Sequence, residues 1–79
     1  MTNREHLLTV LDDAEQSGPV ALATPHGLAV VTYHEETVNS KCVWFYSVIL
    51  DGTFHFASAH EDAVVDTLDT IGVSFRRAS

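Results

Sequence analysis

The chain has 79 residues and a mass of 8.7 kDa, with 11 acidic against 4 basic residues and a formal net charge of -7. Hydrophobic residues make up 46% of it, so the composition predicts one folded domain over residues 1–79 rather than a disordered acidic tail. A protein that grips DNA, RNA or an anionic membrane needs a cationic surface, which four basic residues do not supply. We therefore expect no direct contact with nucleic acid or membrane.

The first predicted element is a helix with signals at both of its ends. Thr2 and Glu5 have the spacing of a capping box, and Gly18 followed by Pro19 marks the end. The apolar residues between them recur at helical spacing: Leu7, Leu8, Leu11 and Ala14. The helix should therefore pack one apolar side against a core.

Three apolar stretches then predict strands. They run from Val20 to Thr24, from Leu28 to His34 and from Cys42 to Leu50, and the last is rich in aromatic and β-branched residues. We interpret residues 35–41, which are mostly polar, as the connection before that last strand.

Asp51-Gly52 predicts a two-residue hairpin, because a type I′ turn needs positive φ at both central positions. The hairpin would pair Leu50 with Thr53, Ile49 with Phe54, Val48 with His55 and Ser47 with Phe56. In this register one face of the hairpin is the expected core face: Val43, Phe45, Ile49, Phe54 and Phe56. The expected outer face carries Trp44, Tyr46, Val48, Thr53 and His55.

The end of the chain predicts a second helix and a last strand. Ser58 and Glu61 repeat the capping-box spacing and would open a helix that runs to about Thr70. Ile71, Val73 and Phe75 alternate as in a strand. The predicted fold is α+β, a mainly antiparallel five-stranded sheet with two helices in the order α-β-β-β-β-α-β.

No catalytic constellation stands out, and we predict that the protein is not an enzyme. The single cysteine, Cys42, is predicted to be a small buried residue. The five histidines lack the spacings with which one helix or strand presents two metal ligands. We therefore name no catalytic residue, no metal ligand and no cofactor.

The compartment is predicted from the same features. A lone cysteine excludes an intramolecular disulfide, and the first residues contain no continuous apolar signal region. The longest apolar runs, Val43 to Tyr46 and Val48 to Leu50, are far shorter than the roughly 20 residues that cross a bilayer. A cytoplasmic location is the expectation.

The order of the strands resembles the first part of the pyridoxamine-phosphate-oxidase-like flavin-binding split barrels. The segments that carry the resemblance are VALATPHGLAVVTY, VWFYSVILDGTFHFAS and IGVSF. The resemblance implies a flavin-binding homodimer or a degenerate relative of one. That family places basic residues near the helix start to hold the flavin phosphate, whereas Glu61 and Asp62 stand there in this chain. Carboxylates would repel the phosphate.

The acidity itself is the leading functional feature. Asp62, Asp66 and Asp69 are spaced to form a stripe on the second helix, with Asp62 and Asp66 about 6 Å apart along its axis. In size, acidity and lack of catalytic motifs the chain resembles small phage-encoded inhibitors, including anti-CRISPR proteins that act as DNA mimics. The alternatives are that the carboxylates serve only solubility or adaptation to high salt.

We predict an acidic interaction protein that binds a basic, nucleic-acid-binding surface of a larger protein complex and inhibits it, as a DNA mimic does. The expected contacts are Asp62, Asp66, Asp69, Glu61, Glu35, Glu36, Asp12, Asp13, Trp44 and Tyr46. Trp44 and Tyr46 enter this set because aromatic residues on an outer sheet face suit a binding hot spot. That face could instead be closed by the chain's own loops or by a second copy in a homodimer.

Overall fold

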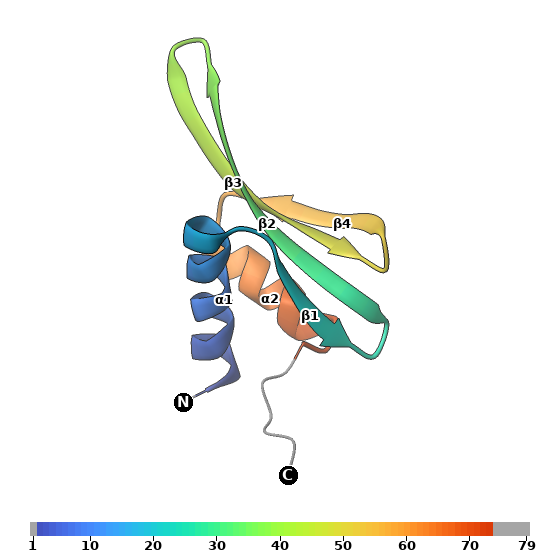
Figure 1. The fold of residues 1–79 in the computed structure, drawn as a ribbon. Helices are drawn as coiled ribbons and strands as arrows, with labels where there is room; N and C mark the ends of the chain where they lie inside the picture. Colours follow the sequence, from blue (N-terminus) through green and yellow to red (C-terminus); the bar gives the residue numbers. More distant parts are fainter. Residues whose placement is uncertain (1, 74–79) are drawn as a thin grey trace.

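The computed structural model describes residues 2–73, which form a sheet with two helices packed on one of its faces (Figure 1). In chain order the elements are α1 (Asn3–Ser17), β1 (Val20–Thr24), β2 (Gly27–Val38), β3 (Lys41–Leu50), β4 (Thr53–Ser58) and α2 (Glu61–Thr70). The sheet is antiparallel with the strand order β1-β2-β3-β4. Helix α1 contacts β1 and β2, and α2 contacts β3, β4 and α1.

The prediction of five strands is wrong, because the sheet has four. Ile71 and Val73 are buried, but they close α2 instead of pairing as a strand. Gly72 adopts a φ of 90°, and the backbone N–H groups of Gly72 and Val73 donate to the carbonyls of Asp69 and Leu68. These two bonds and the positive φ define a Schellman motif, which accounts for the alternation without a strand. Phe75, the last predicted strand residue, lies outside the described residues.

The capping box predicted for the N-terminus of α1 is present, and the one predicted for α2 is not. The capping box of α1 is confirmed, since the Thr2 hydroxyl accepts from the Glu5 backbone and the Glu5 carboxylate accepts from the Thr2 backbone. The box predicted at Ser58 is wrong. The N-cap of α2 is His60, which makes no side-chain capping bond, and the Ser58 hydroxyl accepts instead from the His60 backbone at 3.0 Å.

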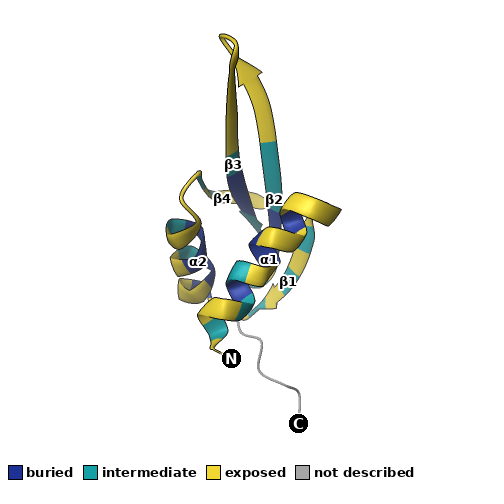
Figure 2. Ribbon diagram, turned by 90° about the vertical axis from the view of Figure 1, so that its left-hand side faces the viewer, coloured by how far each residue is buried: buried dark blue, intermediate teal, exposed yellow. Residues whose placement is uncertain are grey.

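The core lies between the helices and the sheet, as the dark blue segments of Figure 2 show. Helix α1 buries Leu7, Val10, Leu11 and Ala14, and α2 buries Val64, Val65 and Leu68. The sheet contributes Ala29, Val31, Tyr46 and Val48, with Val20, Leu22, Tyr33, Leu50 and Phe56 partly buried around them. The helix-side face of the sheet is therefore the one that closes the core.

This arrangement reverses the predicted faces of β3. The Asp51-Gly52 turn is confirmed by positive φ at both residues, as are the pairs Leu50–Thr53 and Ile49–Phe54. A β-bulge then intervenes between Val48 and Ile49, so Val48 pairs with Phe56 and Ser47 with Ala57. The predicted partners of Val48 and Ser47 are wrong, because one extra residue, His55, is accommodated in β4.

As a result, the predicted core face is mostly the open face. Val48 is 0% exposed and Tyr46 is 2% exposed, whereas Phe54 is 63% and Val43 44% exposed. Phe56 alone of the predicted core set packs against the core, because the bulge brings it to the same side as Val48. The prediction that Trp44 and Tyr46 point away from the helices is wrong.

Residues 35–41 are not a loop, since β2 continues to Val38 and turns directly into β3. Asn39 and Ser40 form the turn with φ values of 51° and 64°. Glu35 to Val38 pairs with Lys41 to Trp44 throughout, and every residue from 35 to 44 is exposed. We call residues 35–44 the arm, which projects beyond the helices (Figures 1 and 2).

Candidate functional site

The acidic stripe predicted on the second helix lies beside the first turn of α1, which supplies its counter-charge. Arg4 donates to Asp62 through Nη2 and to Asp66 through Nη1, the second bond being 3.1 Å long. Asp69 accepts a 3.1 Å hydrogen bond from the Asn3 side chain. The three aspartates thus share one side of α2, but a cationic partner there would compete with Arg4. Because these groups are exposed, each ion pair contributes at most about 1 kcal/mol to stability.

Three aromatic side chains gather where the arm leaves the helix-covered body. Tyr33, Trp44 and Tyr46 share the helix-side face of β2 and β3, because Tyr33 pairs with Tyr46 and Trp44 lies two residues before Tyr46. The ring centroids are 5.4 Å apart for Tyr33 and Tyr46, 6.1 Å for Trp44 and Tyr46, and 6.4 Å for Tyr33 and Trp44. With Glu15 and Glu61 they line a cavity of about 300 Å³, which we call the aromatic cavity.

The two carboxylates of the aromatic cavity are positioned by helix ends. Glu15 lies in the last turn of α1, and Glu61 is the first residue of α2. Neither side chain forms an ion pair or hydrogen bond with another residue that the structure describes. Glu61 suits the positive end of its helix, whereas Glu15 opposes the dipole of α1 at a cost of about 0.3–1 kcal/mol. A carboxylate that opposes its helix dipole breaks a local rule of stability, and such exceptions are expected at functional sites.

Tyr46 is the innermost wall of the aromatic cavity. The residue is 2% exposed, and its hydroxyl makes no hydrogen bond to the described part of the chain. No fully buried side-chain nitrogen or oxygen in that part lacks a partner. The Tyr46 hydroxyl therefore opens into the cavity, where a bound group could hydrogen-bond to it.

The Tyr46 phenol should lower the free energy of unfolding at alkaline pH. Burial, and then the negative charges of Glu15 and Glu61, raises the pKa of Tyr46 to about 12, against about 10 in an unfolded chain. Between these values the folded state binds more protons, so the free energy of unfolding falls by up to about 1.4 kcal/mol per pH unit. We expect Tyr46→Phe to make this fall shallower in denaturant titrations from about pH 9 to about pH 12. An equally steep fall in the variant would contradict the assignment.

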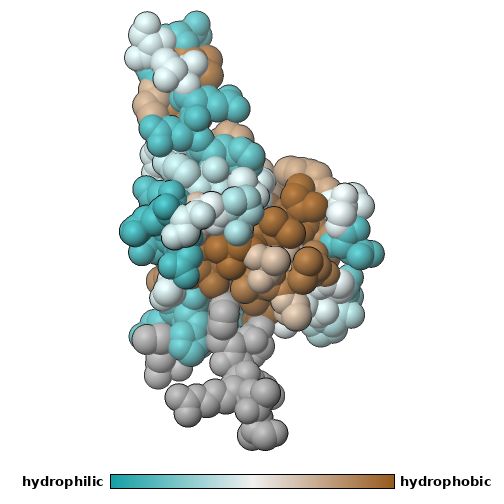
Figure 3. Space-filling model, in the orientation of Figure 1, coloured by the Kyte–Doolittle hydropathy of each residue, from teal (hydrophilic) through white to brown (hydrophobic). Residues whose placement is uncertain are grey.

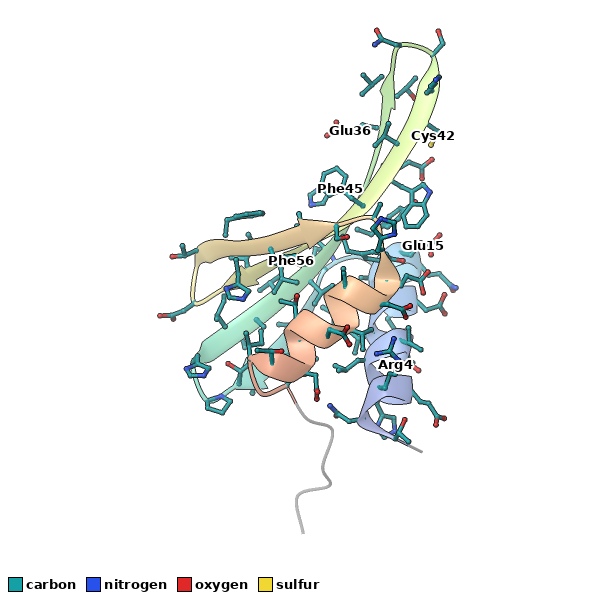
Figure 4. All side chains as sticks on the ribbon, turned by 180° about the vertical axis from the view of Figure 1, so that it is seen from behind. Arg4, Glu15, Glu36, Cys42, Phe45 and Phe56 are labelled. Atoms are coloured by element: carbon teal, nitrogen blue, oxygen red, sulfur yellow. The ribbon has the colours of Figure 1, made fainter. Side chains whose placement is uncertain are left out.

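The arm separates the two glutamates that the sequence places side by side. Glu35 lies on the helix side, where its carboxylate accepts from the Tyr33 hydroxyl at 3.4 Å and from the Cys42 thiol at 3.3 Å. Glu36 lies on the opposite side together with Phe45, as Figure 4 shows. Cys42 is exposed, so the prediction of a buried cysteine is wrong. The hydrogen bond to Glu35 raises the pKa of the Cys42 thiol.

The remaining acidic candidates lie on the outer side of α1. Asp12 accepts a 3.1 Å hydrogen bond from Gln16, one turn later in the helix, and Asp13 is exposed. The negative charge of Asp12 is among those that raise the pKa of Tyr46, so Asp12 contributes to the field at the aromatic cavity. Of the predicted contacts, the structure thus brings Glu61, Trp44 and Tyr46 together, with Glu35 and Asp12 close by.

The face of the sheet opposite the helices is the second candidate surface. Figure 3 shows a contiguous apolar patch over it. Leu28, Val43 and Phe54 are 53%, 44% and 63% exposed, and Val30, Phe45 and Ile49 are half-buried beside them. The described strands place one carboxylate, Glu36, and one ammonium, Lys41, on this open face. It therefore has no net charge in a chain of charge -7.

Two residues of the aromatic cavity, Tyr33 and Glu15, are missing from the contacts predicted from sequence. Tyr33 could have been found from its position opposite Tyr46, but only once the register of β2 and β3 was known. No group of metal-ligating residues occurs among the described residues, nor any helix long and apolar enough to span a membrane. Comparisons with protein-family models, with curated proteins and with solved structures gave no match to this chain.

Proposed function

We propose that the chain is a non-enzymatic acidic interaction protein that binds a basic surface of a larger, nucleic-acid-binding protein complex. By occupying that surface it would compete with nucleic acid and inhibit the complex, as a DNA mimic of the anti-CRISPR kind does. Its lone cysteine fits a reducing compartment such as the cytoplasm. The observation that carries the proposal is the set of carboxylates around the aromatic cavity, which are not neutralised within the described structure.

The internal ion pairs indicate which carboxylates would meet the partner. Arg4 already offsets part of the charge of Asp62 and Asp66, so a partner cation gains less there. Glu15 and Glu61 have no such counter-charge among residues 2–73, and they adjoin Trp44, which is 40% exposed. Trp and Tyr are among the residues enriched at binding hot spots. The aromatic cavity is therefore the expected centre of the contact, and the aspartate row of α2 its periphery.

Charge reversal should separate these two surfaces. The tagged chain is used to capture partners from an extract of the native host, and the proteins released at raised salt are tested for displacement by DNA. We expect Glu15→Lys with Glu61→Lys to weaken capture by at least tenfold, because like charges would then oppose the basic surface. Asp62→Lys with Asp66→Lys changes the net charge by the same amount and should have the smaller effect.

Two results would contradict the proposal. The first is a capture that contains no basic or nucleic-acid-binding protein. The second is equal binding by the wild type and the Glu15→Lys/Glu61→Lys variant, each shown to be folded by circular dichroism.

We further propose that the protein is a homodimer through the open face of the sheet. Two copies of charge -7 repel each other over most of their surfaces, but the open face has no net charge, and Glu36 of one copy could meet Lys41 of the other across a two-fold axis. The arm favours the same arrangement, because a two-stranded hairpin on its own is only marginally stable in water.

The size of the open face sets the scale of this interface. The four strands hold 5, 12, 10 and 6 residues, so the face covers about 500 Å² in projection, at about 3.3 Å per residue and about 4.8 Å per strand. This is smaller than the roughly 800 Å² per partner of a standard interface, so the dimer should be a weak one. Pairing there would leave the aromatic cavities accessible on the two outer sides of the dimer.

A further inference from the structure

We infer that the aromatic cavity binds a methylated ammonium group, either on a lysine side chain of a partner or on a small choline-like molecule. The inference deepens the proposed function and rests on it for the partner-borne source. The binding chemistry itself needs no partner and is tested without one.

The arrangement of the rings is the first support. The interplanar angles are 32° for Tyr33 and Trp44, 58° for Tyr33 and Tyr46, and 82° for Trp44 and Tyr46. Three rings inclined in this way offer π faces and edges from different directions around one small volume. With centroids 5.4–6.4 Å apart, one cation could lie within about 6 Å of all three, which is the range of cation–π attraction.

The carboxylates indicate that the ligand carries a positive charge. Glu15 and Glu61 line the same cavity and have no cationic partner among the described residues. An anion would be repelled by both, and a neutral molecule would gain no charge–charge attraction from either. A cation gains from the two charges and from the ring faces together, which aromatic cages for quaternary ammonium groups exploit.

The Tyr46 hydroxyl and the volume of the cavity indicate more closely which cations would bind. The hydroxyl opens into the cavity and has no hydrogen-bond partner within residues 2–73, so it could hydrogen-bond to a ligand that retains an N–H or carries a hydroxyl, such as dimethyl-lysine or choline. A volume of about 300 Å³ is at the small end for ligand sites. It suits a methylated head group. Methyl groups also fill the space between the rings, which a bare, strongly hydrated ammonium does not.

The chain carries its own reporter for this binding, because Trp44 is its single tryptophan and lines the aromatic cavity. Choline chloride is titrated into the wild-type protein at constant ionic strength, and the Trp44 fluorescence is followed. We expect a saturable change with a Kd of about 1 mM, the weak affinity that a small cation can reach. The neutral isostere 3,3-dimethylbutanol should produce no saturable change. Absence of saturation by choline, or equal binding of the isostere, would overturn the inference.

Variants then test which groups act. We expect Tyr33→Leu, and separately Glu15→Gln with Glu61→Gln, to weaken choline binding about tenfold. Tyr33→Phe keeps the ring face and should weaken binding much less than Tyr33→Leu, which separates the contribution of the ring from a general loss of shape. Glu36→Gln with Asp13→Asn is the control with the same change of net charge, because Glu36 lies on the other side of the arm and Asp13 is exposed on α1 outside the cavity lining. An equal loss in Glu36→Gln/Asp13→Asn would mean that net charge alone is sensed and would overturn the site.

The source of the group is resolved by a second comparison. Short glycine-flanked peptides with unmodified, dimethyl- or trimethyl-lysine are titrated in the same way. Tighter binding of a methylated peptide than of choline supports a partner side chain, and tighter binding of choline supports a free small molecule. If choline binds but the Glu15→Lys/Glu61→Lys variant still captures the partner, the inferred binding site is supported and the proposed function is contradicted. Preference for the unmodified peptide would overturn the requirement for methylation.

Discussion

Replacing Val48 with aspartate should unfold the protein, whereas aspartate at Val43, five residues earlier on the same strand, should leave it folded. Val48 is 0% exposed and packs between the sheet and the helices. An unpaired carboxylate at that position costs several kcal/mol of desolvation. A domain of this length is stable by only about 4–12 kcal/mol. Val43 is 44% exposed on the open face, so its carboxylate would stay in water.

The two valines are matched controls for each other, because both substitutions remove the same side chain from β3 and add the same charge. The measurements are the far-ultraviolet circular dichroism spectrum and the midpoint of urea unfolding. Val48→Ala provides the graded version and should lower the free energy of unfolding by about 1–3 kcal/mol. If Val43→Asp unfolds the protein and Val48→Asp does not, the faces of the sheet are those predicted from the sequence and not those of the structure.

The fold was predictable from sequence where a short motif is compatible with only one local structure. The capping box of Thr2 and Glu5 and the Asp51-Gly52 turn each satisfy backbone geometry that few other residues allow, and both are confirmed. The faces of β3 were not predictable in this way, because both carry large apolar side chains. Where neither face is polar, the alternation does not specify which one is buried. The bulge opposite Val48 then changed the register by one residue.

The site was predictable only in part, for a related reason. Trp44, Tyr46 and Glu61 stood out by residue type, but their meeting depends on long-range pairing. The aromatic cavity exists because α1 ends, and α2 begins, beside the strand pair that holds Tyr33 opposite Tyr46. Likewise, the spacing of Asp62 and Asp66 predicted their row correctly, but the position of Arg4 could not be read from α2 alone. The spacing of residues in the sequence shows which of them share a side of one helix. Which residues of other elements lie opposite them depends on how the elements pack.

The dimer proposal leads to the second large effect, a conversion of dimer to monomer by Leu28→Asp with Phe54→Asp. Both residues lie on the open face and are more than half exposed, so the substitutions should leave the core of each copy intact. In a symmetric dimer the pair of substitutions buries four new charges without partners. We expect the dissociation constant to rise by at least a hundredfold, because each unpaired carboxylate opposes burial of this surface. Sedimentation over a series of protein concentrations measures the change.

A control variant distinguishes the effect of added net charge on dimerisation from the effect of placing that charge on the open face. Thr9→Asp with Gln16→Asp adds the same two charges to the exposed side of α1, where the proposed dimer makes no contact. This control should raise the dissociation constant far less, since its charges stay in water and are screened beyond roughly 10 Å at moderate salt. Equal dissociation by the two variants would assign the effect to net charge. If the wild-type protein sediments as a monomer at every concentration, the dimer proposal is wrong, and the apolar face does not bind a second copy of the chain.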